Sequence, residues 1–130
     1  MAFLVDTSAW IRHFSSKDHF DLRSVCAPDE RVLCLPVYQE ILQGIRDEGA
    51  FRRIRDILNA ASWVEDPLGR GIYAQAVDLF RSARRQGLAV RSSIDCLIAA
   101  CAIRHDLTVL HHDRDYSALA GVSPLKQKPI

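Results

Sequence analysis

The sequence lacks any apolar run near the roughly 20 residues that a membrane-spanning helix needs. Its first residues carry no basic side chain and reach an acid at Asp6, so we do not expect a secretion signal. None of the cysteines, Cys26, Cys34, Cys96 and Cys101, forms a C-x-x-C pair. These absences exclude membrane and disulfide-rich classes, and they predict a cytoplasmic protein with reduced thiols and no thiolate zinc site.

Neither sign of charge is in large excess, because 17 Lys and Arg face 16 Asp and Glu and give a net charge of +1. This balance argues against a strongly basic nucleic-acid coat protein, although it says nothing about local patches. The chain has 130 residues and 48% hydrophobic residues, which predicts a single domain over residues 1–130 with its own core.

Short apolar runs alternate with segments of helical spacing along the whole chain. Strands are predicted at 3–5, 32–35, 63–64 and 107–110, with a last one near Leu125. Helices are predicted at 7–14, about 19–26, from Pro36 to a break at Gly49, and at 51–58, 74–85, 94–105 and around 116–120, while 126–129 reads as a loose tail. Uniformly apolar strands between helices indicate an α/β fold with three α/β/α layers around a short, mostly parallel sheet.

Acidic residues fall where such a fold places its ligands, beyond the carboxyl ends of the strands. Asp6 ends the first strand, Asp113 and Asp115 follow the strand 107–110, and Asp95 lies in the first turn of the helix 94–105. We therefore expect Asp6, Asp95 and Asp113 on one rim of the sheet. Glu40 lies in the second turn of the helix that begins near Pro36, beside its apolar stripe.

Each acid also has a purely structural interpretation. These are a helix cap for Asp6, a capping box with Ser92 and a favourable interaction with the helix dipole for Asp95, turn formation for Asp113 and Asp115, and a solvated helix position for Glu40. Several carboxylates on one rim nevertheless repel one another unless a cation lies among them. An all-oxygen cluster suits Mg²⁺ or Mn²⁺, and such an ion lowers the pKa of a bound water and neutralises phosphoryl charge.

Four segments, 5–11, 38–44, 94–102 and 112–116, resemble in order and spacing the four acidic motifs of PIN domains. The resemblance extends over about residues 2–126 and is closest to the VapC-type ribonuclease toxins of toxin–antitoxin pairs. It implies a divalent-metal-dependent endoribonuclease in which a metal-activated water attacks the phosphodiester.

By motif, the resemblance implies that Asp6, Glu40, Asp95 and Asp113 are the catalytic, metal-binding acids, with Asp115 as a less constant fifth ligand. It also places Thr7 and Ser8 where the family has a small hydroxyl residue. One of the two is expected to bond a ligand water or the scissile phosphate.

Two positions depart from the family pattern. Tyr116 stands where Phe is common and His112 where a small polar residue is common, and neither is expected to touch the acids. A histidine beside a turn is typically exposed, and this interpretation is favoured for His111 and His112 over a place beside the substrate.

RNA would be held through its phosphates, for which Arg12, Arg91 and Arg114 are the candidates near the acids. The more distant arginines at 52, 53, 55, 84 and 85 are typical of a solvated helix face, and Trp10 and Tyr38 are typical of a core. The resemblance further implies a homodimer and a VapB-type antitoxin, for which the helices at 51–58 and 74–80 offer grooves.

Other classes fit the residues less well. A phosphatase of the aspartyl-nucleophile type needs a second Asp two residues after the first, where this chain has Ser8. A receiver-type signalling domain needs an adjacent acid pair and a lysine at a strand end, and neither is found. A PIN nuclease of RNA processing without a toxin role stays open, as does a non-catalytic RNA-binding PIN domain.

Overall fold

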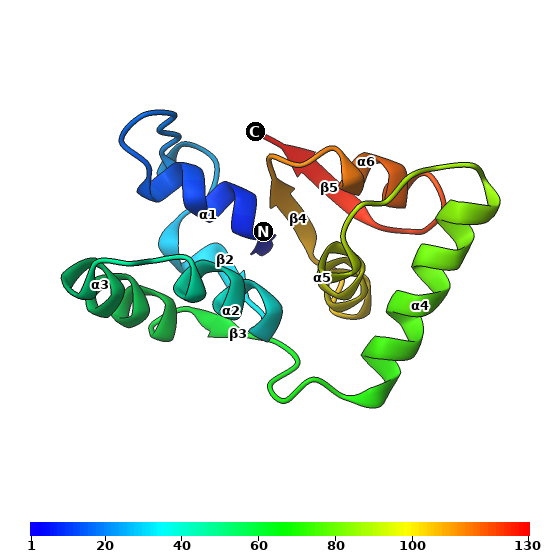
Figure 1. Ribbon diagram of the computed structural model, residues 1–130, viewed down its shortest axis with the longest axis horizontal. Coiled ribbons are helices and arrows are strands. Elements are labelled where there is room, and N and C mark those ends of the chain that lie inside the picture. The colour runs from blue at the N-terminus through cyan, green and yellow to red at the C-terminus, as the bar shows by residue number, and fades with distance from the viewer.

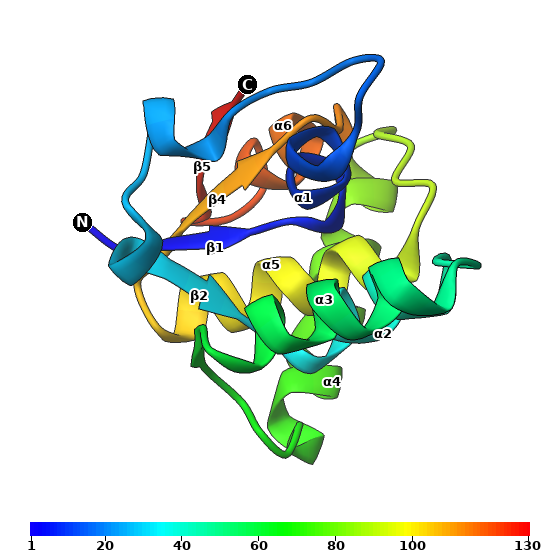
Figure 2. The same cartoon turned by 90° about the vertical axis from the view of Figure 1, so that its left-hand side faces the viewer.

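A computed structural model describes residues 1–130 and contains one five-stranded sheet with the order β3-β2-β1-β4-β5. The strands are β1 (Phe3–Val5), β2 (Arg31–Leu33), β3 (Ser62–Trp63), β4 (Thr108–His111) and β5 (Lys126–Pro129). Every neighbouring pair is parallel, and β1, β2 and β4 point the same way in Figure 2. The predicted parallel sheet is therefore confirmed.

Helices flank this sheet. They are α1 (Thr7–Phe14), α2 (Leu35–Gln43), α3 (Glu48–Asn59), α4 (Arg70–Arg85), α5 (Ser93–Arg104) and α6 (Asp115–Ala120). Figure 1 shows α1, α2 and α3 on one side of the molecule and α4, α5 and α6 on the other, with strands between them. Right-handed crossovers predict this division, because the chain moves in opposite directions from β1 to β3 and from β4 to β5. No helix combines the length and apolar character needed to cross a membrane.

Helix α5 is apolar on nearly every side because it packs against other elements on two sides. This helix lies between α4 and β4, as Figure 1 shows, and seven of its twelve residues are buried. A helix packed on two sides has no room for a broad polar face. All four cysteines are buried and free.

The strand order reverses at β1, and this reversal positions the acids. Phe3 of β1 pairs with Arg31 on one side and with Thr108 of β4 on the other. The connections that leave β1 and β4 therefore diverge to opposite faces, which leaves a crevice beyond the carboxyl ends of these two strands. Asp6 directly follows β1, and Asp113 follows β4 by two residues.

One predicted helix is absent, and the predicted break between the next two helices is wrong. In place of a helix at 19–26 there is only a 3₁₀ turn, Leu22–Ser24, because the Leu22 amide donates to His13 Nδ1 at 3.1 Å instead of to a helical carbonyl. The break after α2 comes at Gly44, and Gly49 lies in the first turn of α3. That helix begins earlier than expected because the Asp47 carboxylate accepts from the Ala50 amide at 2.8 Å and caps it.

The segment interpreted as a loose tail is the edge strand β5. It pairs with β4 over its whole length, from Thr108 with Lys126 to His111 with Pro129. The Ile130 amide extends this contact with a 2.9 Å hydrogen bond to the His111 carbonyl. Lysine and proline are common on edge strands, where they hinder pairing with other chains, and they also remove the apolar signal of a strand.

Truncation after Leu125 tests this assignment. Loss of the strand removes its hydrogen bonds to β4, each worth about 1 kcal/mol net, so Tm should fall by about 5 °C or more. Thermal unfolding followed by circular dichroism measures the change. Lys128→Ala, an exposed substitution within β5, should leave Tm unchanged. Equal Tm values for the truncated and full-length chains would restore the loose-tail interpretation.

Candidate metal centre

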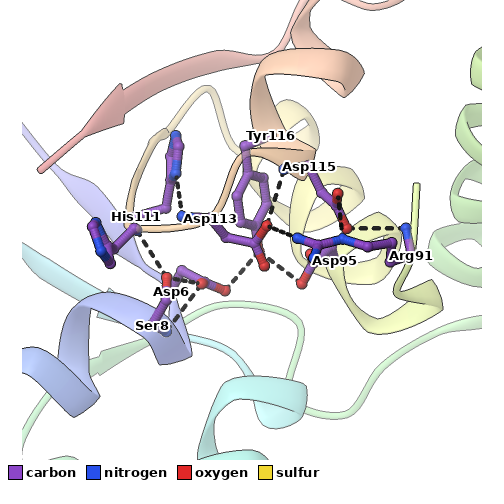
Figure 3. Close-up of polar contacts among 9 residues, drawn as sticks. Asp6, Ser8, Arg91, Asp95, His111, Asp113, Asp115 and Tyr116 are labelled. Carbon is purple, nitrogen blue, oxygen red and sulfur yellow. Dashed lines mark hydrogen bonds and ion pairs between the residues drawn. The ribbon is translucent and has the colours of Figure 1, made fainter. Parts of the chain in front are cut away.

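Three carboxylates form a compact cluster beyond the ends of β1 and β4. One oxygen from each of Asp95, Asp113 and Asp115 lies within 4.8 Å of the others. Asp95 is 5% exposed and Asp115 is 2% exposed, whereas Asp113 is half-buried. Figure 3 shows the three side chains beside one another. Residues from α5 and from the start of α6 thus meet at the predicted rim, with Asp6 close beside them.

Asp95 is the acid whose surroundings fit a positive partner best. Its Oδ2 atom is buried and accepts no hydrogen bond. A buried, unpaired carboxylate oxygen is costly, and three acids at this separation add mutual repulsion. An oxygen-lined cluster with an open buried ligand atom fits a hard divalent cation.

The same burial and charge repulsion affect the protonation of Asp95. Burial raises the pKa of Asp95 from 3.8 to about 8, with further increases from the charges of Asp6, Asp113 and Asp115. The first of these causes is the loss of hydration, and the others are like-charge repulsion. Without a cation, Asp95 therefore keeps its proton at neutral pH.

Both carboxylate oxygens of Asp6 accept hydrogen bonds. Its Oδ2 accepts from the Ser8 amide at 3.0 Å and from the Ser8 hydroxyl, so Asp6 does cap α1 as the structural interpretation proposed. Its Oδ1 accepts from the Tyr116 hydroxyl at 2.6 Å, and the same hydroxyl lies 3.5 Å from Asp95 Oδ1. The prediction that Tyr116 does not touch the acids is wrong.

Tyr116 is fully buried, and its contact with the acids is the feature of the site that sequence reasoning missed. A buried tyrosine needs a partner for its hydroxyl, and α6 brings this ring from the turn after Asp113 to the end of β1. Burial, with the nearby charges of Asp6 and Asp95, raises the pKa of Tyr116 well above its usual range. The hydroxyl therefore remains a hydrogen-bond donor.

Glu40 lies outside the three-residue cluster. Its Oε1 accepts from the Thr7 hydroxyl at 2.7 Å, which links α2 to the residue after Asp6. The Ser8 hydroxyl donates to Asp6 and accepts from the His112 amide at 2.9 Å. Both predicted hydroxyl residues are thus already bonded to the acids of the site, and their contact with substrate stays a prediction.

The three candidate arginines lie in different surroundings. Arg91 contacts the cluster: its amide donates to Asp115 Oδ2 at 3.0 Å, and its guanidinium lies 3.4 Å from both Asp113 and Asp115. Arg12 instead contacts Asp18 at 3.3 Å and covers the Phe20 ring. Arg114 is exposed just before α6, between the two acids of its turn.

His111 is buried, contrary to the favoured interpretation, whereas His112 is exposed as expected. The Asp113 amide donates to His111 Nδ1 at 3.1 Å. The ring proton therefore lies on Nε2, which donates to Gln127 Oε1 at 2.6 Å. His111 connects β5 to the backbone of Asp113 and positions that acid.

The capping-box interpretation of Asp95 finds no support. Ser92 occupies the N-cap position of α5, but its side chain makes no capping hydrogen bond. Asp113 does form the predicted turn, because its Oδ1 accepts from the Asp115 amide at 3.0 Å. The place of Asp95 in the first turn of α5 still suits the helix dipole, so only the capping box of its structural interpretation fails.

The raised pKa of Asp95 predicts how metal-free stability depends on pH. The folded protein keeps a proton on Asp95 that the unfolded chain releases, so the free energy of unfolding should fall as pH rises from about 4 to about 8. Asp95→Asn cannot ionise and should reduce this fall, giving a Tm several degrees above wild type at about pH 8 and little difference at about pH 5.

Thermal unfolding in EDTA at both pH values measures this effect. Asp29→Asn, a change at an exposed acid on the 3₁₀ turn Pro28–Glu30, should follow wild type. Parallel pH profiles for wild type and Asp95→Asn would contradict the proposed protonation.

Comparison with known proteins identifies the family. The sequence matches the PIN domain family over residues 3–122. It is 32% identical over 130 residues to ribonuclease VapC11 of Mycobacterium tuberculosis, with 95% of each chain covered. It is 30% identical over 128 residues to ribonuclease VapC18 of the same organism, with 95% of this chain and 90% of the relative covered.

A solved structure shares the fold. VapBC-1 from nontypeable Haemophilus influenzae has a chain that superposes with a TM-score of 0.75 at 16% identity, covering 99% of this chain and 98% of the other. With the sequence match and the placement of the acids, this likeness leads to one conclusion: the chain belongs to the PIN domain family.

Proposed function

We propose that this protein is a divalent-metal-dependent endoribonuclease and the toxin of a VapBC-type toxin–antitoxin pair, with residues 1–130 forming one PIN domain. The observation that carries the proposal is the buried, unpartnered Oδ2 of Asp95 within a cluster of three carboxylates. The names of the relatives, VapC ribonucleases at 30–32% identity, supply the substrate class.

Asp95, Asp113 and Asp115, with Asp6 and Glu40 on the adjoining strand end and helix, would hold Mg²⁺ or Mn²⁺. A bound ion of this kind supplies a water of lowered pKa and neutralises charge on the phosphoryl oxygens. The chain itself fixes the acids: Ser8 and Tyr116 hold Asp6, and His111 holds the backbone of Asp113. Catalytic carboxylates fixed in this way need little rearrangement when substrate binds.

Arg91 and Arg114, which lie beside the acids, would bind RNA phosphates at this site. The Arg91 side chain is 58% exposed, and its two 3.4 Å contacts with the acids are long. A guanidinium held this loosely can turn toward a phosphate and bind it through two nitrogens. Arg12, turned toward Asp18, lies in a less suitable position.

Two apolar hollows suit the proposed protein partners, a VapB-type antitoxin and a second copy of the chain. One, of about 360 Å³, lies between α4 and α5 and is lined by Tyr73, Ala76, Val77, Phe80, Arg81, Ser93, Cys96 and Leu97. None of the proposed metal-binding acids lines this hollow. The other hollow includes Glu40 and Ile54. An antitoxin segment in the second hollow would contact Glu40, one of the proposed metal-binding acids.

The working compartment of such an enzyme is the cytoplasm, which holds its RNA substrate. Four free, buried cysteines are compatible with a reducing environment.

Cleavage of RNA by inhibitor-free protein tests the activity. With Mg²⁺ or Mn²⁺, wild type should cut total RNA of its host into discrete fragments, and EDTA should stop the reaction. Asp95→Ala should lower the rate by more than about 100-fold, since even residues that support metal ligands contribute about 10–100-fold. Asp95→Ala, prepared identically, thereby controls for contaminating nucleases, whereas Asp29→Asn, a change at an exposed acid, should cleave like wild type.

The toxin role has a separate readout. Expression of wild type in a bacterial host should arrest growth, and Asp95→Ala should not. Metal-dependent cleavage without growth arrest would favour RNA processing, and metal binding without cleavage would favour a non-catalytic RNA-binding domain.

Arg91→Ala should raise KM for RNA by about tenfold with a smaller change in kcat, because a charge-assisted hydrogen bond to phosphate contributes ~1.5 kcal/mol or more. Steady-state cleavage of a short fluorescent RNA measures both constants. Arg23→Ala removes an equally charged, exposed side chain that pairs with Asp21, and it should leave KM unchanged. A fall in kcat at constant KM would show that Arg91 serves the acids and not the RNA.

A further inference from the structure

One hydroxyl group contacts acids from two separate segments of the site. Tyr116 Oη lies 2.6 Å from Asp6 Oδ1, at the end of β1, and 3.5 Å from Asp95 Oδ1, in the first turn of α5 (Figure 3). The side chain is 0% exposed. The shorter distance assigns the hydroxyl proton to Asp6.

The four carboxylate oxygens of these two acids have different partners. Asp6 Oδ2 accepts from the amide and the hydroxyl of Ser8, and Asp6 Oδ1 accepts from Tyr116. Asp95 Oδ1 faces Tyr116, whereas Asp95 Oδ2 is buried without a partner. The arrangement therefore leaves one buried oxygen open beside Asp113 and Asp115.

We propose that Tyr116 is a positioning residue for the metal centre, whose hydroxyl holds Asp6 Oδ1 beside Asp95 before a cation arrives and leaves Asp95 Oδ2 open to the cation. This inference rests on the proposed metal-dependent function. Two buried carboxylates with no donor between them repel and separate. A cation would then have to bring them back together, which weakens its binding.

The surroundings of Tyr116 keep the hydroxyl in place. Its ring packs against the His111 ring with centroids 4.8 Å apart. His111 is itself fixed by the Asp113 amide on Nδ1 and by Gln127 on Nε2. Through His111, the edge strand β5 therefore supports both the Tyr116 hydroxyl and the backbone of Asp113. Phenylalanine at position 116 would keep the packing and lose only the donor.

Tyr116→Phe provides the direct test. Isothermal titration calorimetry of inhibitor-free protein with Mn²⁺ should show about tenfold weaker binding, the lower end of the effect of removing a partner of a metal ligand. Tyr38→Phe is the matched control, because the Tyr38 ring packs against Trp63 and its substitution should leave the affinity unchanged. A residue with only a structural role would lower Tm without changing Mn²⁺ affinity.

Unchanged or tighter Mn²⁺ binding by folded Tyr116→Phe would overturn the inference and leave the proposed function intact. Absence of Mn²⁺ binding by wild type would overturn both.

Wild-type protein offers a second measurement that does not depend on the variant folding. The chain contains three tyrosines, Tyr38, Tyr73 and Tyr116. In protein carrying ¹³C at the tyrosine Cζ position, diamagnetic Mg²⁺ should shift the Tyr116 resonance, since its hydrogen-bond acceptor would become a metal ligand. Tyr38→Phe and Tyr73→Phe assign the other two signals. A Tyr116 signal that stays fixed while calorimetry records Mg²⁺ binding would overturn the inference.

Discussion

Repulsion among carboxylates at the meeting point of β1 and β4 is the constraint on which the rest of the site depends. Asp95 and Asp115 are almost completely buried, and Asp113 lies within 4.8 Å of both. A fold that brings like charges together must either neutralise them or supply donors. Protonation of Asp95, with a pKa of about 8, is how the metal-free protein relieves part of this repulsion. A divalent cation among these acids would relieve it without a proton and would thereby couple metal binding to stability.

Some of the contacts that fix the acids come from parts of the chain that have no acidic motif. The Arg91 amide contacts Asp115, and the Asp113 amide is fixed through His111 by Gln127 of β5. These contacts explain why an edge strand of lysine, glutamine and proline matters to the site. Hydrogen bonds to charged groups contribute about 1.5–3 kcal/mol each, enough to offset part of the repulsion.

The sequence predicts the sheet and the rim well because short apolar strands and the acids after them follow directly from a parallel α/β pattern. It fails where one side chain redirects the backbone, as His13 does at Leu22, and where an edge strand lacks apolar residues, as at Lys126–Pro129. It also fails for Tyr116, because spacing along the chain gives no indication that a ring on α6 reaches the end of β1. Such contacts depend on how α6 packs.

The structural and functional interpretations of the acids prove compatible instead of exclusive. Asp6 caps α1 through the Ser8 amide, and this bond fixes the carboxylate at the end of β1 with Oδ1 toward Tyr116. Asp113 forms a turn with the Asp115 amide, and this turn brings both carboxylates to one side. Asp95 alone has a buried oxygen with no protein partner. The capping and turn bonds are therefore the means by which the fold orients its acids, and the open oxygen of Asp95 is the atom that a divalent cation would fit.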